Sequence, residues 1–183
     1  LRGQHIVPLP ASLTSGRYRF FLGDFPLEEI TVIAPERSFT QPEISQSIDA
    51  AFTTADGAPV ATLVGLAVDS SSSSCSPAPL LPCALPLVWR ADGEASAGYH
   101  AFVHLVDEAG NILAQSDAVP AGWTRPTTGW LPGEYIMDVH TLTLPPELPP
   151  GQLAFRAGLY DPVTDERLSV NGTDAVLITL PGS

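Results

Sequence analysis

Hydrophobic residues along this chain fall in short runs that prolines and glycines separate, and the runs are rich in Val, Ile, Leu and aromatic side chains. Almost every window long enough for three helical turns contains a Pro or Gly. This pattern predicts an all-β chain rather than a helical one. The expected strands are 17–23, 29–34, 60–69, 85–91, 99–107, 111–118, 134–144, 152–161, 166–170 and 175–180.

The expected strands recur every 8 to 12 residues or so, which is typical of an antiparallel β-sandwich of immunoglobulin-like type. A jelly roll and a small barrel are the alternatives. Residues 36–47 are poor in large apolar side chains and carry a proline, and we interpret them as a linker. The sandwich is therefore expected over 48–183, and residues 17–34 are expected to form a β-hairpin packed on the sandwich or on a neighbouring chain.

Three connections carry turn chemistry. Gly110 follows Asp107 closely, Pro162 follows Asp161, and Asn171 precedes a glycine in "NGT". Glycine permits a positive φ, proline presets the first turn position, and Asn-Gly favours a tight hairpin. The "NGT" string also matches a glycosylation acceptor, but we favour the turn. The acidic loops lack the ligand spacing of an EF-hand, so no metal is expected.

The chain contains an internal echo: "HIVPLPASLTSG" at 5–16 resembles "HTLTLPPELPPG" at 140–151. Seven identical pairs have residue numbers that differ by 135, and they pair residues 5, 9, 10, 13, 16, 20 and 23 with 140, 144, 145, 148, 151, 155 and 158. Further along, "ITV" at 30–32 resembles "ITL" at 178–180. The echo predicts that 1–35 is the tail of a preceding β-sandwich module.

Composition narrows the possible partners. The formal charge is −12, from 20 acidic residues against eight arginines, with no lysine. An acidic surface repels phosphate backbones and anionic lipid, so nucleic acid is excluded as a partner. No run of about 18 apolar residues is present, which predicts no direct membrane insertion.

Cys75 and Cys83 flank a Ser/Pro-rich stretch that lacks metal-ligand spacing. We predict that they form a local disulfide, which implies an extracytoplasmic setting. Two free thiols are the alternative.

Three segments carry a family resemblance: "FVHLVDEAGNILAQSDAVPAG", "PTTGWLPGEYIMDVHTLTLPPELPPG" and "FRAGLYDPVTDERL". In these segments the chain resembles β-sandwich modules that occur in tandem in the extracytoplasmic C-terminal regions of large bacterial membrane proteins. Many of those proteins look like glycosyltransferases, notably in Chloroflexi-type bacteria. The resemblance implies an accessory module whose partners are neighbouring modules of the same polypeptide, and it implies no cofactor and no catalytic residues.

A polar group of three residues could carry acid–base chemistry, namely His104, Asp138 and His140. Asp138 and His140 lie two apart on one expected strand, so they share a face, and His104 lies on another strand. Such a pair can act in general acid–base catalysis. No nucleophile accompanies it at a recognisable spacing, so we interpret these residues as a structural polar cluster and expect no catalysis.

A separate group of aromatic and charged residues could bind a ligand. Trp123, Arg125, Trp130, Glu134 and Tyr135 crowd one Pro/Gly-rich connection, and aromatic faces beside planar polar groups suit sugar rings. Packing of Trp130 into the end of the core is the alternative for that residue. The sequence thus predicts a non-catalytic extracytoplasmic accessory or scaffold domain. A carbohydrate-binding module is the second hypothesis and a hydrolase with an unrecognised site is the third.

Overall fold

The fold was analysed in a computed structural model that describes residues 9–68 and 83–179. The chain divides into two compact units, Leu1–Arg37 and Ser38–Ser183. The prediction of an all-β antiparallel sandwich is confirmed, because every strand pair in the described residues is antiparallel and two sheets enclose one core. The immunoglobulin-like subtype stays a prediction.

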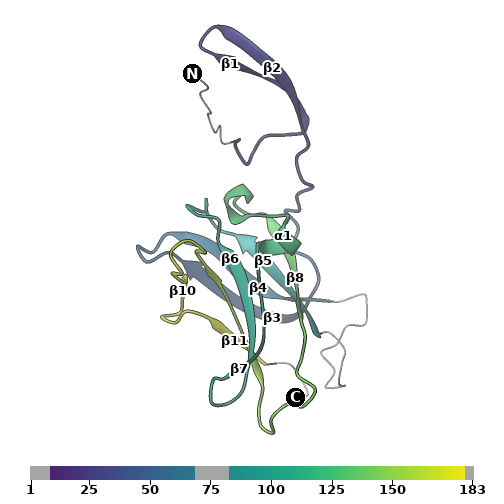
Figure 1. The fold of residues 1–183 in the computed structure, drawn as a ribbon, viewed down its shortest axis with the longest axis vertical. Helices are drawn as coiled ribbons and strands as arrows, with labels where there is room; N and C mark the ends of the chain where they lie inside the picture. Colours follow the sequence, from purple (N-terminus) through teal and green to yellow (C-terminus); the bar gives the residue numbers. More distant parts are fainter. Residues whose placement is uncertain (1–8, 69–82, 180–183) are drawn as a thin grey trace. The chain divides into compact units, whose positions relative to one another are not determined.

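The first unit contains a β-hairpin, drawn in purple in Figure 1. Strand β1 (Gly16–Leu22) pairs antiparallel with β2 (Phe25–Val32), with a register shift between Arg19 and Phe21. Gly23 in the turn has a φ of 61°, a conformation that glycine adopts at little cost. The hairpin expected within 17–34 is therefore present.

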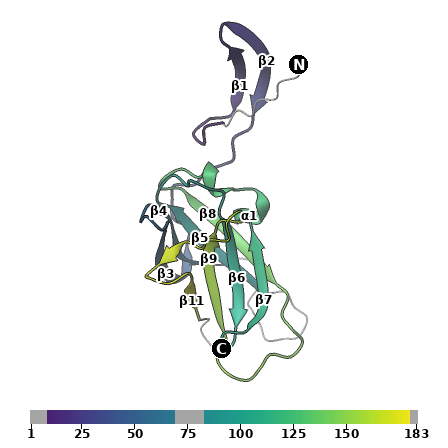
Figure 2. The same ribbon diagram turned by 60° about the vertical axis from the view of Figure 1, so that its left-hand side comes forward.

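The second unit is the sandwich, and Figure 2 shows its two layers. One sheet has the strand order β10-β3-β4-β5-β8 and the other has the order β11-β9-β6-β7. The strands are β3 (Ile44–Thr53), β4 (Pro59–Ala67), β5 (Cys83–Ala91), β6 (His100–Val106), β7 (Ile112–Ala118), β8 (Tyr135–Leu142), β9 (Ala154–Tyr160), β10 (Ser169–Val170) and β11 (Val176–Ile178).

Strand β3 is absent from the expected strands, and its start at Ile44 lies inside the predicted linker 36–47. Its pattern is a period-two alternation in which Ile48, Ala50 and Phe52 face the core. A bulge interrupts the strand, since the register shifts between Ser47 and Ala50 and Asp49 has a φ of 56°. Because polar residues alternate with the apolar ones and a bulge interrupts the alternation, this strand contains no continuous apolar run that would predict it.

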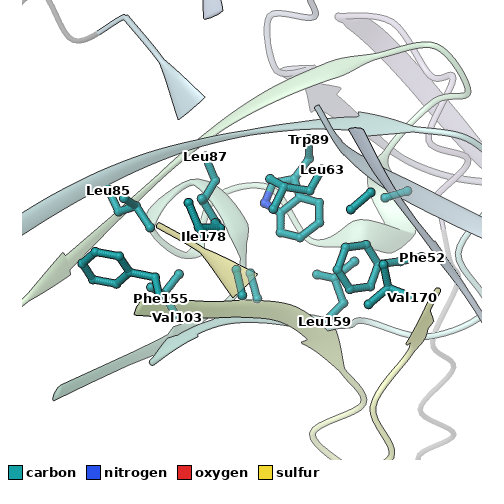
Figure 3. Close-up of a cluster of buried hydrophobic side chains, with 14 of the residues drawn as sticks. Phe52, Leu63, Leu85, Leu87, Trp89, Val103, Phe155, Leu159, Val170 and Ile178 are labelled. Atoms are coloured by element: carbon teal, nitrogen blue, oxygen red, sulfur yellow. The ribbon is translucent and has the colours of Figure 1, made fainter. Parts of the chain in front are cut away.

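The core lies between the two sheets, as Figure 3 shows for its larger side chains. Trp89 of β5 is fully buried and meets Phe52 of β3 edge-on, with ring centroids 5.5 Å apart. Val103 of β6, with Phe155 and Leu159 of β9, closes the core from the opposite sheet. Burial of such side chains, each worth about 1.5–3 kcal/mol, is the main stabilising term of the unit.

The predicted turns are confirmed. The Asp107 carboxylate accepts from both the backbone and the side-chain N–H groups of Asn111, and Gly110 has a φ of 84°. Asp161 accepts from the Val163 N–H at 2.8 Å. Asn171 and the following glycine both have positive φ, which is the requirement of a type I′ turn.

Between β7 and β8 the chain forms a short left-handed turn, α1 (Pro120–Trp123), and a 3₁₀ turn, η1 (Thr127–Gly129). In α1, Ala121, Gly122 and Trp123 have φ values of 55°, 61° and 71°. For residues other than glycine this conformation costs on the order of 1–2 kcal/mol each. The turn is therefore held by contacts from elsewhere. In the ranges 9–68 and 83–179 no helix is long and apolar enough to cross a bilayer.

Candidate ligand-binding site

The five residues predicted to bind a ligand do not share one surface. Trp123 is 65% exposed, whereas Trp130 is 3% exposed and Glu134 is fully buried. Tyr135 packs with Val64 and Val88 in a small apolar cluster separate from the main core. Because Tyr135 alternates with the core residue Ile136, this cluster lies on the outer face of the five-stranded sheet.

An ion pair and hydrogen bonds stabilise the β7–β8 connection, and they involve Arg125, Trp130 and Glu134. The Arg125 guanidinium pairs with the buried Glu134 carboxylate, which also accepts from the Leu131 N–H at 3.0 Å. The Trp130 indole N–H donates to the Arg125 carbonyl at 2.9 Å. Trp130 is therefore packed into the core, as the alternative interpretation of this residue expected. A ligand contact by these three residues stays a prediction.

Asp138 and His140 lie on the inner face of β8 and are 1% and 2% exposed. The Asp138 carboxylate lies 3.0 Å from His140 Nε2 and accepts from the Trp89 indole N–H at 3.2 Å and from the Ala121 backbone N–H at 2.8 Å. His140 Nδ1 is 3.0 Å from the Ser116 hydroxyl of β7. With a proton on Nε2, His140 donates to Asp138, and its Nδ1 can accept from the Ser116 hydroxyl.

Ser116 was missed in the sequence because the packing of one sheet on the other, not sequence spacing, brings β7 and its Ser116 to His140 of β8. The group resembles the residue types of a Ser-His-Asp triad, but a triad needs a serine on an open site. Here His140 and Asp138 are both buried, and the Asp138 carboxylate accepts from three donors. The network instead joins β7 to β8 and fixes the α1 turn.

His104 lies on the outer face of β6, since Val103 and Leu105 on either side of it belong to the core. Its Nε2 is 3.5 Å from the Asp117 carboxylate, and its buried Nδ1 has no hydrogen-bond partner in the described part of the chain. Burial lowers the pKa of His104, and the nearby Asp117 opposes part of that shift. His104 is therefore neutral near pH 7 and does not form part of the Asp138–His140 network.

Three aromatic rings follow one another on this outer face, and we call Trp123, His100 and Tyr160 the aromatic row. The ring centroids of Trp123 and His100 are 5.3 Å apart, and those of His100 and Tyr160 are 5.6 Å apart. His100 and Tyr160 are register partners across β6 and β9. Burial and the charges of Asp117 and Asp165 raise the pKa of Tyr160, so its phenol is protonated at neutral pH.

A pocket of about 290 Å³ lies near the aromatic row, although none of the three rings lines it. Its lining includes Tyr99, Asp161, Glu166 and Arg167. Tyr99 and Leu168 line the pocket and belong to the core, so the pocket lies on the inner side of the strands whose outer faces carry His100 and Tyr160. The Arg167 guanidinium also lies over the Phe102 ring, 4.5 Å from its centroid, and pairs with Asp174.

The sequence pointed to Trp123 but not to His100, Tyr160 or Arg167. These residues come from separate strands and loops, and only the β6–β9 register and the fold of the β9–β10 loop bring them together. Within residues 9–68 and 83–179, no group of three or more His, Cys, Asp or Glu side chains is placed to hold a metal ion.

Cys75 lies outside the described residues, so the disulfide stays a prediction, and Cys83 is buried at the start of β5.

Comparison of the chain with protein-family models, curated proteins and solved structures found no match.

Proposed function

We propose that this chain is a non-catalytic module of a tandem β-sandwich array, and that β1 and β2 are the last strand pair of a preceding module. The observation that carries the proposal is a structural counterpart of the sequence echo. The residue-number difference of 135 relates β1 to β9. The difference of 148 between "ITV" at 30–32 and "ITL" at 178–180 relates β2 to β11. Both pairs are antiparallel neighbours, as two copies of one unit would be.

The registers of the two pairs support the same origin. In the sandwich, Phe155 lies opposite Ile178, and the echo maps these residues onto Phe20 and Ile30. In the hairpin, Ile30 lies opposite Tyr18, so the register has moved by two residues. A shift of two keeps each side chain on its original face of the sheet.

Exposed apolar side chains supply a reason for a partner. Leu22, Phe25 and Leu27 of the hairpin are 67%, 77% and 52% exposed. Their sandwich counterparts β9 and β11 bury Phe155, Ala157 and Ile178 almost completely. An isolated two-stranded hairpin is marginally stable in water, and the missing layers of a preceding module would cover these side chains.

The absence of catalysis is part of the proposal. It is supported by the three hydrogen bonds that the Asp138 carboxylate accepts and by the burial of His140. A hydrolase would need both residues to rearrange and open a route to Ser116.

The setting of the module rests on the sequence resemblance. We place it in the extracytoplasmic region of a membrane-anchored, glycosyltransferase-like protein, where its partners are neighbouring modules of the same polypeptide. A Cys75–Cys83 disulfide fits an oxidising compartment of this kind.

Two substitutions in adjacent residues test the array, in a protein that includes the coding sequence upstream of Leu1. Phe20 is the counterpart of the buried Phe155, whereas Phe21 lies on the other face of β1. Phe20→Asp should destabilise the preceding module by about 3 kcal/mol, as for loss of a buried Phe, and Phe21→Asp should have little effect. Equal effects of the two, or an upstream sequence without a β-sandwich module, would refute the array.

A further inference from the structure

We propose that the aromatic row and the adjoining pocket bind a neutral oligosaccharide. This inference concerns the outer face of the four-stranded sheet and does not depend on the preceding module. It names His100, Tyr160, Glu166 and Arg167 as contacts alongside Trp123, and none of the first four was predicted from the sequence.

The first step is that Trp123 is held out to solvent by the fold itself. Its backbone is left-handed, and the preceding Ala121 is fixed by the buried carboxylate of Asp138 at 2.8 Å. Trp123 is 65% exposed, so its burial contributes little to offset the cost of its left-handed backbone. Strain of this kind is found where a side chain must be presented to a ligand.

The second step is that Trp123 does not stand alone. Its ring meets His100 edge-on at 79°, and His100 meets Tyr160 at 78°. Successive rings are therefore turned roughly perpendicular to their neighbours. Single exposed apolar residues are ordinary on protein surfaces, but a row of three half-buried or exposed rings drawn from α1, β6 and β9 forms an extended aromatic surface.

Charged groups near the aromatic row can supply hydrogen bonds to a ligand. Glu166 and Arg167 line the pocket. Arg167 links it to the outer face, because its guanidinium lies over the Phe102 ring and its backbone forms an isolated bridge with Tyr160. Carboxylate oxygens accept and guanidinium N–H groups donate hydrogen bonds. The pocket volume of about 290 Å³ is close to the lower limit of small-molecule sites, which suits one sugar unit rather than a large cofactor.

These features together select the ligand class. A pyranose ring offers a face of C–H groups for an aromatic ring and a rim of hydroxyls for carboxylate and guanidinium partners. Asp117 and Asp165 act on Tyr160 electrostatically, and the chain carries a net charge of −12. Like-charge repulsion therefore disfavours acidic glycans and favours uncharged ones.

The test is a calorimetric titration of the full chain with cellohexaose, mannohexaose, chitohexaose and an oligogalacturonate. We expect saturable binding of at least one neutral hexasaccharide, weaker binding of its disaccharide, and none of the oligogalacturonate. Trp123→Ala should weaken the affinity tenfold or more, and His100→Ala should weaken it measurably. Met137→Ala is the matched control, since Met137 is an exposed apolar residue on the outer face of the other sheet.

Circular dichroism should show that each variant keeps the fold of the parent. The proposal is overturned if none of the neutral sugars binds saturably, or if Trp123→Ala binds as well as the parent. It is also overturned if oligogalacturonate binds best, or if sedimentation shows a dimer that Trp123→Ala dissociates, because the row would then be a protein contact. None of these results bears on whether β1 and β2 belong to a preceding module.

Discussion

The Asp138 carboxylate accepts the backbone N–H of Ala121 at 2.8 Å, and so a buried strand residue holds the left-handed turn that displays Trp123. The same carboxylate accepts from Trp89 and contacts His140. One side chain thus connects the core, the β7–β8 edge and the exposed aromatic row.

Replacing Asp138 should disturb all three regions. In Asp138→Asn, the amide nitrogen cannot accept, so at least one of the donors loses its partner. We expect a loss of about 2–4 kcal/mol in the free energy of unfolding, which is typical of breaking a buried charged network. Urea denaturation measures this loss. The exposed Glu147→Gln is the control, and a change below about 0.5 kcal/mol in Asp138→Asn would show that the network is not structural.

His104 should make stability depend on pH. Burial lowers its pKa in the folded state, so the unfolded chain binds the proton more tightly. Stability should therefore be fully present above the ordinary histidine pKa of about 6.5 and should fall as the pH drops below it. Urea midpoints at pH 7.5 and pH 5.5 test this expectation.

His104→Gln is the control for the pH effect. Asp117, Arg156 and Arg167 act electrostatically on His104, and all three remain in the variant. The difference between the two midpoints should therefore be smaller in His104→Gln than in the parent. An equal difference would assign the pH dependence to other groups.

Gly158 should be required by the Phe102 ring. A methyl group at Gly158 would lie 2.6 Å from a Phe102 ring carbon and 3.1 Å from the Asp174 carbonyl oxygen. Gly158→Ala should therefore cost about 1–3 kcal/mol, as overpacking does, and Phe102→Leu should restore part of the loss. Gly98→Ala is the control, because nothing lies within 4 Å of its added methyl. Thermal denaturation that ranks the two variants equally would contradict this packing.

We expect neither Cys75 nor Cys83 to be a free thiol in protein isolated without reductant. Titration in denaturant without reductant should detect no thiol, and prior reduction should reveal two. Two reactive thiols without reductant would exclude the disulfide and weaken the extracytoplasmic assignment.

The sequence predicted most of the strands because Pro and Gly marked their ends and because Val, Ile and Leu filled them. It missed β3, whose bulge at Asp49 and polar outer face leave no apolar run. The same limit applies to the sites. Trp123 stood out as an aromatic residue in a loop. Ser116 beside His140 depends on how the two sheets pack, and Tyr160 beside His100 depends on strand register, and spacing along the chain encodes neither.

The echo had one further limit. Gly23 and Gly158 are equivalent in number, yet Gly23 forms a turn with a φ of 61° and Gly158 makes room for Phe102 within a strand. An identity between two segments therefore does not establish a shared role for the residue. Strand pairing is the stronger argument for a common origin of β1–β2 and β9–β11.

Amide hydrogen exchange in β1 and β2 tests the array most directly. In this chain we expect the hairpin amides to exchange much faster than those of β5 and β6, because two strands without a packed face open readily. In the longer protein that includes the upstream coding sequence, the same amides should exchange as slowly as those of β9. Fast exchange in both proteins, or protection already complete in this chain, would contradict the account.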